Sequence, residues 1–116
     1  GKLNSILGLQ LERGLAGLGP NADYSRLAVA YEPVWAIGTG QTASDEDIRM
    51  VHTLVRELLS SLLGSNGIGI QILYGGSVKP DNAKAILSLD NVDGLLVGGA
   101  SLQAQSFADI VRADLA

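Results

Sequence analysis

The chain has 116 residues, with 8 Lys and Arg against 12 Asp and Glu, a net charge of −4, 15 Gly and no Cys, which is enough for one small domain. The scattered cations argue against nucleic-acid binding, the apolar runs are too short to span a membrane, and the lack of Cys excludes disulfides and thiolate chemistry. We therefore expect a protein of a reducing, cytoplasmic compartment. Gly1 stands where an initiating Met would stand and no secretory leader follows, so we expect a cut or processed end.

The first half of the chain predicts a helix, a strand and a second helix. Apolar residues at three- and four-residue steps predict the helix over 3–18, although three glycines weaken it. The continuous apolar run at 27–31 predicts a strand covered on both faces, as in a parallel sheet. Ser44, three residues before Asp47, predicts the start of a helix that runs through Leu62.

The second half repeats this order. Gly and Asn at 64–67 end the helix, and residues 68–74 predict a second strand. Residues 83–87 predict a helix, residues 94–97 a third strand, and the segment from Phe107 to Leu115 a last helix. Strands separated by helices pair in parallel through right-handed crossovers, so the fold class is α/β. Three strands cannot close a barrel, and we therefore expect the chain to be part of a larger sheet.

Glu32 is the first of three features that directly follow predicted strands, where parallel α/β folds place their ligands. We expect a carboxylate at the end of an apolar strand to be partly desolvated, which suits it to abstract a proton. A solvated loop acid is the alternative, and from position alone it carries the greater weight.

The second feature is the loop at 33–40. A rigid start, a bulky apolar centre and a small-residue end are typical of a lid that excludes water. The N–H of Gly38 is available in this pattern to contact an anion. The loop is not a Walker motif, because Gln41 follows Gly40 where that motif requires Lys. The alternative for Trp35 is a place in the core.

The third feature is a pair of glycine-rich joints, Gly75-Gly76-Ser77 and Gly98-Gly99, each between a strand and a helix. Backbone without Cβ atoms approaches a ligand closely, and N–H groups at helix starts favour phosphate. Tight turns are the alternative. His52, the one histidine, lies within a helix among apolar residues, so we assign it a packing or surface role and expect no metal site.

Three stretches together resemble triosephosphate isomerases in order and spacing. They are Ala30–Gly40, Tyr74–Val78 and Val92–Leu102. The resemblance covers essentially the whole chain and implies the C-terminal portion of a TIM (β/α)8 barrel, from the helix before the sixth strand to the end. By this resemblance residues 1–116 form a partial barrel domain with strands six to eight, which are parallel and carry their helices.

The resemblance also implies an activity, namely interconversion of dihydroxyacetone phosphate and glyceraldehyde 3-phosphate through an enediol, with no cofactor. Glu32 would be the catalytic base. The phosphate would be bound by Gly38, Ser77, Gly98 and Gly99. The lid would consist of Pro33, Val34, Trp35, Ala36, Ile37, Gly38 and Thr39.

Other parts of the family's active site have no match in this sequence. The family uses an Asn and a Lys after the first strand, and a His electrophile with an acidic neighbour after the fourth. Much of its homodimer interface also has no match. We therefore expect the isolated chain to be inactive without a complementary N-terminal barrel segment, because the developing oxyanion would have no support.

Two further readings differ in class. One is a catalytically incomplete, phosphate-binding or self-associating α/β module, because exposed parallel edges invite pairing. The other is a different phosphate-binding barrel enzyme, which the Glu32 and lid motif disfavours.

Overall fold

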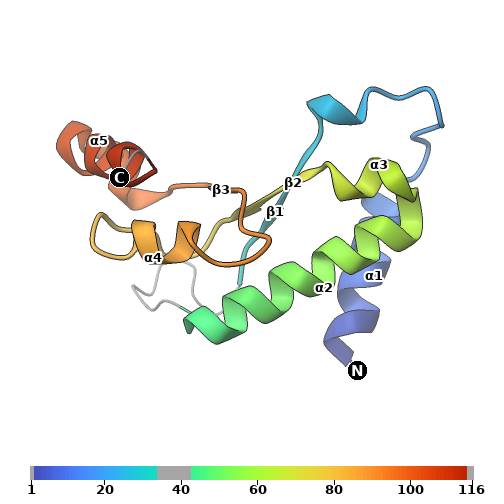
Figure 1. Cartoon of the computed structure of the whole chain (residues 1–116), viewed down its shortest axis with the longest axis horizontal. Coiled ribbons are helices and arrows are strands. Elements are labelled where there is room, and N and C mark those ends of the chain that lie inside the picture. Colours follow the sequence, from blue (N-terminus) through green and yellow to red (C-terminus); the bar gives the residue numbers. More distant parts are fainter. Residues whose placement is uncertain (1, 34–42, 115–116) are drawn as a thin grey trace.

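The computed structural model describes residues 2–33 and 43–114. Within them, β1 (Ala28–Tyr31), β2 (Gln71–Tyr74) and β3 (Gly94–Leu95) form a parallel sheet in the order β1-β2-β3. The α-helices are α1 (Lys2–Gly14), α2 (Asp45–Leu63), α3 (Ser65–Ile68), α4 (Ala83–Leu87) and α5 (Ala104–Ala113). Two 3-10 helices are η1 (Tyr24–Arg26) and η3 (Gly99–Leu102). Figure 1 shows α1 and α2 beside β1 and β2, and α4 and α5 towards the β3 end of the sheet. The predicted α/β class is confirmed.

Helix α2 begins where the sequence predicts. The Asp47 N–H donates to the Ser44 hydroxyl at 3.1 Å, which caps the helix. Three acidic residues in the first turn, 45–47, complement the positive end of the helix dipole. One face of α2 is buried, through Ile48, Val51, His52, Val55 and Leu59. These contacts fix α2 against the sheet.

The described helices cover one face of the sheet. Val29 and Tyr31 on β1 are half-buried against a cluster that joins α1 and α2, whereas Ala28 and Ala30 are exposed. On β2, Ile72 is likewise buried. The prediction that strand 27–31 is covered on both faces is therefore wrong for the described residues, because Ala28 and Ala30, which alternate with Val29 and Tyr31, are exposed.

The segment 64–70 also differs from the prediction of a turn followed by a strand. Residues 65–68 form the helical turn α3, and β2 begins only at Gln71. The guanidinium of Arg56 donates to the carbonyls of Gly67 and Ile68, at 3.3 and 3.1 Å, and to that of Ile70. A cation on α2 thus satisfies carbonyls that a strand would have paired with a neighbour.

Three other bounds are shorter than predicted. Helix α1 ends at Gly14, and Gly17 beyond it has a positive φ of 88°. Strand β3 ends at Leu95, two residues early. The last helix is described to Ala113, and Leu115 lies outside the described residues. The helix at 83–87 is confirmed. No helix in the described ranges has the length and apolar character needed to cross a bilayer.

Candidate functional site

Parallel pairing brings the segments that follow the three strands to one edge of the sheet. Tyr31 is in register with Tyr74, and Tyr74 with Leu95. Glu32 and Gly75 follow directly, and Gly98 follows three residues after Leu95. The sequence prediction that the acid and the glycine pairs share an edge is therefore confirmed for the described residues.

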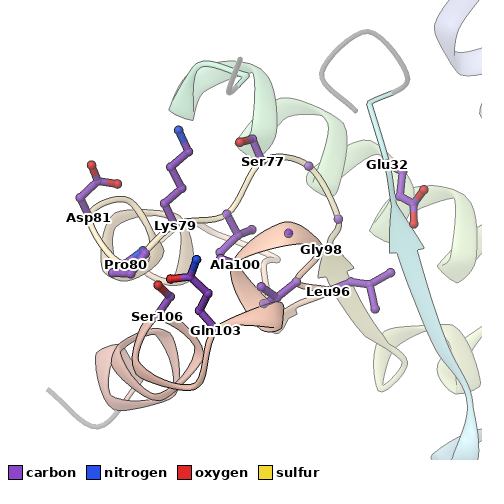
Figure 2. Close-up of a pocket in the computed structure, with 15 residues that line it drawn as sticks. Glu32, Ser77, Lys79, Pro80, Asp81, Leu96, Gly98, Ala100, Gln103 and Ser106 are labelled. Carbon is purple, nitrogen blue, oxygen red and sulfur yellow. The ribbon is translucent and has the colours of Figure 1, made fainter. Parts of the chain in front are cut away.

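A cavity of about 1020 Å³ opens at this edge. It brings together four of the predicted site residues, Glu32, Ser77, Gly98 and Gly99. Figure 2 shows Glu32 coming from the end of β1, while the other labelled residues come from the segments after β2 and β3. The cavity is therefore assembled from three segments that are distant in sequence.

Glu32 packs directly on the backbone of Gly75. The Gly75 N–H donates to the carbonyl of Tyr31 at 2.8 Å, which extends the pairing of β1 with β2. A Cβ placed on Gly75 would lie 2.7 Å from Cγ of Glu32, well inside contact distance. A side chain at position 75 would therefore force the Glu32 side chain out of its present position. Glu32 itself is exposed, so the predicted partial burial of its side chain is not observed among the described residues.

Gly76 is held against the ring of Tyr74. A Cβ on Gly76 would lie 2.0 Å from the Tyr74 hydroxyl oxygen and 2.3 Å from Cζ. The Tyr74 side chain is fully buried, and burial raises the pKa of its hydroxyl, an effect that the backbone of Ala43 opposes. The tyrosine therefore supports the floor of the loop after β2, and a side chain at position 76 would displace it.

Ser77 belongs to a loop that Asn82 holds in place. The Asn82 amide group donates to the carbonyl of Ser77 at 3.1 Å, and its oxygen accepts from the N–H of Lys79 at 2.8 Å. The N–H groups of Asn82 and Ala83 donate to the carbonyl of Lys79. This network fixes the backbone from Ser77 to the start of α4 and so gives the cavity a preformed wall.

Gly98 and Gly99 lie at the start of η3. Both are exposed, and a Cβ on either would meet no atom within 4 Å. The Ser101 N–H and hydroxyl both donate to the carbonyl of Gly98, at 2.9 and 2.6 Å, which closes the turn. Open space beside a fixed backbone is what an anion needs to reach peptide N–H groups.

His52 lies away from the described cavity lining. Its side chain is fully buried, its Nδ1 is 3.0 Å from the carbonyl of Asn91, and its ring contacts that of Tyr31 edge-on. Desolvation lowers its pKa, although the Asn91 carbonyl opposes this. The predicted packing role is confirmed. Among the described residues, no three His, Asp or Glu side chains form a group that could hold a metal ion.

Sequence reasoning missed part of the cavity wall. Lys79, Asp81, Gln103 and Ser106 also line the cavity. Lys79 and Asp81 could have been predicted as lining residues, because they lie close to Ser77 in the sequence. Of the predicted lid, Pro33 is buried, whereas Val34, Trp35, Ala36, Ile37, Gly38 and Thr39 lie outside the described residues.

Parallel strands alternating with helices, with a cavity at the carboxyl ends of the strands, are the architecture of part of a TIM barrel. The family model described as triosephosphate isomerase matches residues 1–114. The chain belongs to the triosephosphate isomerase family.

Individual relatives agree with this assignment. A triosephosphate isomerase from Nitratidesulfovibrio vulgaris strain Miyazaki F is 58% identical over 113 residues, which are 97% of this chain and 45% of that protein. One from Lawsonia intracellularis is 55% identical and is covered to 44%. The crystal structure of triosephosphate isomerase from Bartonella henselae has a TM-score of 0.78 and 36% identity, over 99% of this chain and 46% of that one. The chain thus spans less than half the length of these relatives.

Proposed function

We propose that this chain supplies the base, the lid and the phosphate-binding loops of a triose-phosphate isomerase. One observation carries the proposal: the Glu32 carboxylate and the loops of Ser77 and Gly98 line a single cavity at the carboxyl edge of the sheet. A carboxylate and a cluster of backbone N–H groups in one cavity suit a substrate with a phosphate at one end and an acidic C–H at the other.

Glu32 acts as the base in this proposal. It removes a proton from the hydroxyl-bearing carbon next to the carbonyl of dihydroxyacetone phosphate. The electron pair of that C–H bond forms the C=C bond of the enediol, and the carbonyl oxygen takes up a proton from an acid that lies outside this chain. Return of a proton from Glu32 to the former carbonyl carbon, with loss of the proton from the other hydroxyl, gives glyceraldehyde 3-phosphate. The reaction thus moves one proton between adjacent carbons and one between their oxygens, and it needs no redox partner.

The phosphate is held at the other end of the cavity. The N–H groups of Gly98 and Gly99 and the loop of Ser77 bind its oxygens, and the N–H of Gly38 joins them when the lid at 33–39 closes. Preformed donors stabilise the dianion without reorganisation. Closure also removes water from Glu32, which is exposed in the described residues.

Turnover requires residues from outside this chain. The proposal therefore includes a complementary N-terminal barrel segment, which pairs with the free edge of β1 and supplies the electrophile for the developing oxyanion. We also propose that residues 1–116 contain strands six to eight of the barrel. The proposal further includes the homodimeric state of the family and a cytoplasmic location.

A hybrid protein tests the proposal. In it, this chain replaces the matching 45% of the Nitratidesulfovibrio vulgaris relative, and conversion of glyceraldehyde 3-phosphate is measured by a coupled dehydrogenase assay. Glu32→Gln keeps the shape of the side chain and removes the proton acceptor, so kcat should fall by about 10²- to 10⁴-fold with KM little changed. Glu57→Gln, the same change at an exposed site on α2, should leave both constants unchanged. Equal activity of the two variants would refute the assignment of Glu32.

The second candidate is a module that self-associates and has no catalytic activity. Its supporting observation is an accessible surface of 7070 Å², whereas a compact monomer of 12.0 kDa exposes about 6,000 Å². An apolar groove of about 550 Å³ between α1 and β1, lined in part by Leu3, Ile6 and Ala30, accounts for some of the excess. Sedimentation equilibrium of the chain alone decides this candidate, because a monomer at all concentrations would exclude it.

A further inference from the structure

The charges around the cavity are few and mixed. Its described lining carries two acids, Glu32 and Asp81, and one cation, Lys79. In residues 2–33 and 43–114 the ion pairs join arginines to acids, and Lys79 takes part in none of them. A phosphate dianion that enters this cavity therefore meets one positively charged side chain of the described lining, that of Lys79.

The backbone that carries Lys79 is fixed. Its N–H and carbonyl are both bonded to the Asn82 region, and the same Asn82 holds the carbonyl of Ser77. Figure 2 shows the Lys79 and Ser77 side chains pointing to the same side of the view, and Asp81 further out along the loop. The exposed Lys79 side chain therefore starts from a fixed point in the same loop as Ser77, at the lining of the cavity.

We propose that Lys79 and Asp81 together set the electrostatic field that a phosphate dianion meets at this cavity, Lys79 strengthening its capture and Asp81 weakening it. The proposal rests on the proposed function. Both side chains act on the charge of the phosphate through space, and neither contacts the reacting carbon atoms. Their opposite charges on one short loop make the field adjustable by substitution at either position.

Titration of glycerol 3-phosphate into the full chain tests the inference. Binding is followed by the amide NMR shifts of Ser77 and Gly98, at about 20 mM and about 500 mM salt, because the higher concentration screens solvated charges. Lys79→Gln should raise Kd about two- to fivefold at low salt, and Asp81→Asn should lower it by a similar factor. At high salt these differences should largely disappear. Lys79→Arg keeps the charge and should restore binding.

Two matched controls separate a local field from the overall net charge. Lys84→Gln and Asp90→Asn change the net charge equally at exposed positions outside the cavity lining, and each should change Kd by less than about 1.5-fold. Glycerol, which lacks the phosphate, should show no difference among the variants. In the hybrid enzyme, kcat/KM for glyceraldehyde 3-phosphate should follow the same order while kcat stays constant.

The inference is overturned if Lys79→Gln and Lys84→Gln weaken binding equally, if Asp81→Asn weakens rather than strengthens it, or if high salt leaves the differences intact. Absence of glycerol 3-phosphate binding to the parent chain and unchanged kcat/KM in the hybrid variants would also overturn it. These outcomes are distinct from failure of the proposed function, which the Glu32→Gln hybrid tests through kcat.

Discussion

Gly67→Ala should be among the most destabilising single-methyl changes in this chain. Gly67 is buried where α3 crosses α2, and a Cβ there would lie 2.2 Å from the carbonyl oxygen of Leu59 and 2.9 Å from the N of Ser60. Both are backbone atoms, so no rotamer change can relieve the overlap. A normal contact requires α3 to move away from α2 by about 1 Å.

That movement also strains the bonds made by Arg56. Its guanidinium donates to the carbonyls of Gly67 and Ile68 at 3.3 and 3.1 Å, and hydrogen bonds from a charged donor contribute about 1.5–3 kcal/mol each. Overpacking alone costs about 1–3 kcal/mol. Together these effects should lower the free energy of unfolding by about 3 kcal/mol or more, and the melting temperature by more than about 10 °C.

Gly69→Ala is the matched control, two residues along the chain. Gly69 has φ −89° and ψ −4°, and a Cβ there would meet no atom within 4 Å. This substitution should change stability by less than about 1 kcal/mol, in the stabilising direction, because it reduces the freedom of the unfolded chain. Urea denaturation followed by circular dichroism measures both variants. Equal midpoints for the two would refute the argument that the close approach of α2 and α3 excludes a side chain.

Three further predictions concern pH, the partly exposed ion pair of Arg56 with Asp93, and the proposed phosphate site. The pKa of His52 is lowered in the folded chain, so unfolding takes up a proton; stability should fall as the pH drops below about 6.5 towards the folded pKa, and His52→Phe should flatten this part of a pH series of urea midpoints. Asp93→Ala removes an acceptor from Arg56 at 2.6 Å and should cost about 1–2 kcal/mol by the same denaturation assay, whereas Asp90→Ala should cost almost nothing. In Gly98→Ala the added Cβ would meet no protein atom within 4 Å, so the melting temperature should stay within about 2 °C while the binding of glycerol 3-phosphate weakens. If stability fell as well, Gly98 would be needed for the turn and its role in binding would be refuted.

The secondary structure that sequence predicts best is decided by local interactions. The start of α2 follows from Ser44 and the acids behind it, which act within one turn, and the buried stripe of α2 follows from its three- and four-residue spacing. The parallel order of the strands follows from the helices between them. The helix start can be predicted from the sequence because the interacting residues lie within a few positions of each other. The strand direction can be predicted because a helix that connects two strands of one sheet favours parallel pairing.

The errors lie where distant residues decide. Residues 65–68 form a helical turn because Arg56, about ten residues earlier, binds their carbonyls and because Gly67 fits against Leu59. Nothing within the segment itself favours a helix over a strand. The apolar run at 27–31 likewise predicts burial on both faces, yet Ala28 and Ala30 of β1 are exposed in the described residues.

Candidate site residues were predictable from the sequence because motif and strand end coincide at Glu32, Ser77 and Gly98. Their catalytic and phosphate-binding roles, and the lid, stay predictions. Only the tertiary structure decided that Glu32 rests on Gly75, that Tyr74 fills the space beneath Gly76, and that Lys79 joins the same cavity. The physical reason is that sequence periodicity fixes which face of an element is apolar, whereas close approaches between loops depend on how three separate strands align at one edge.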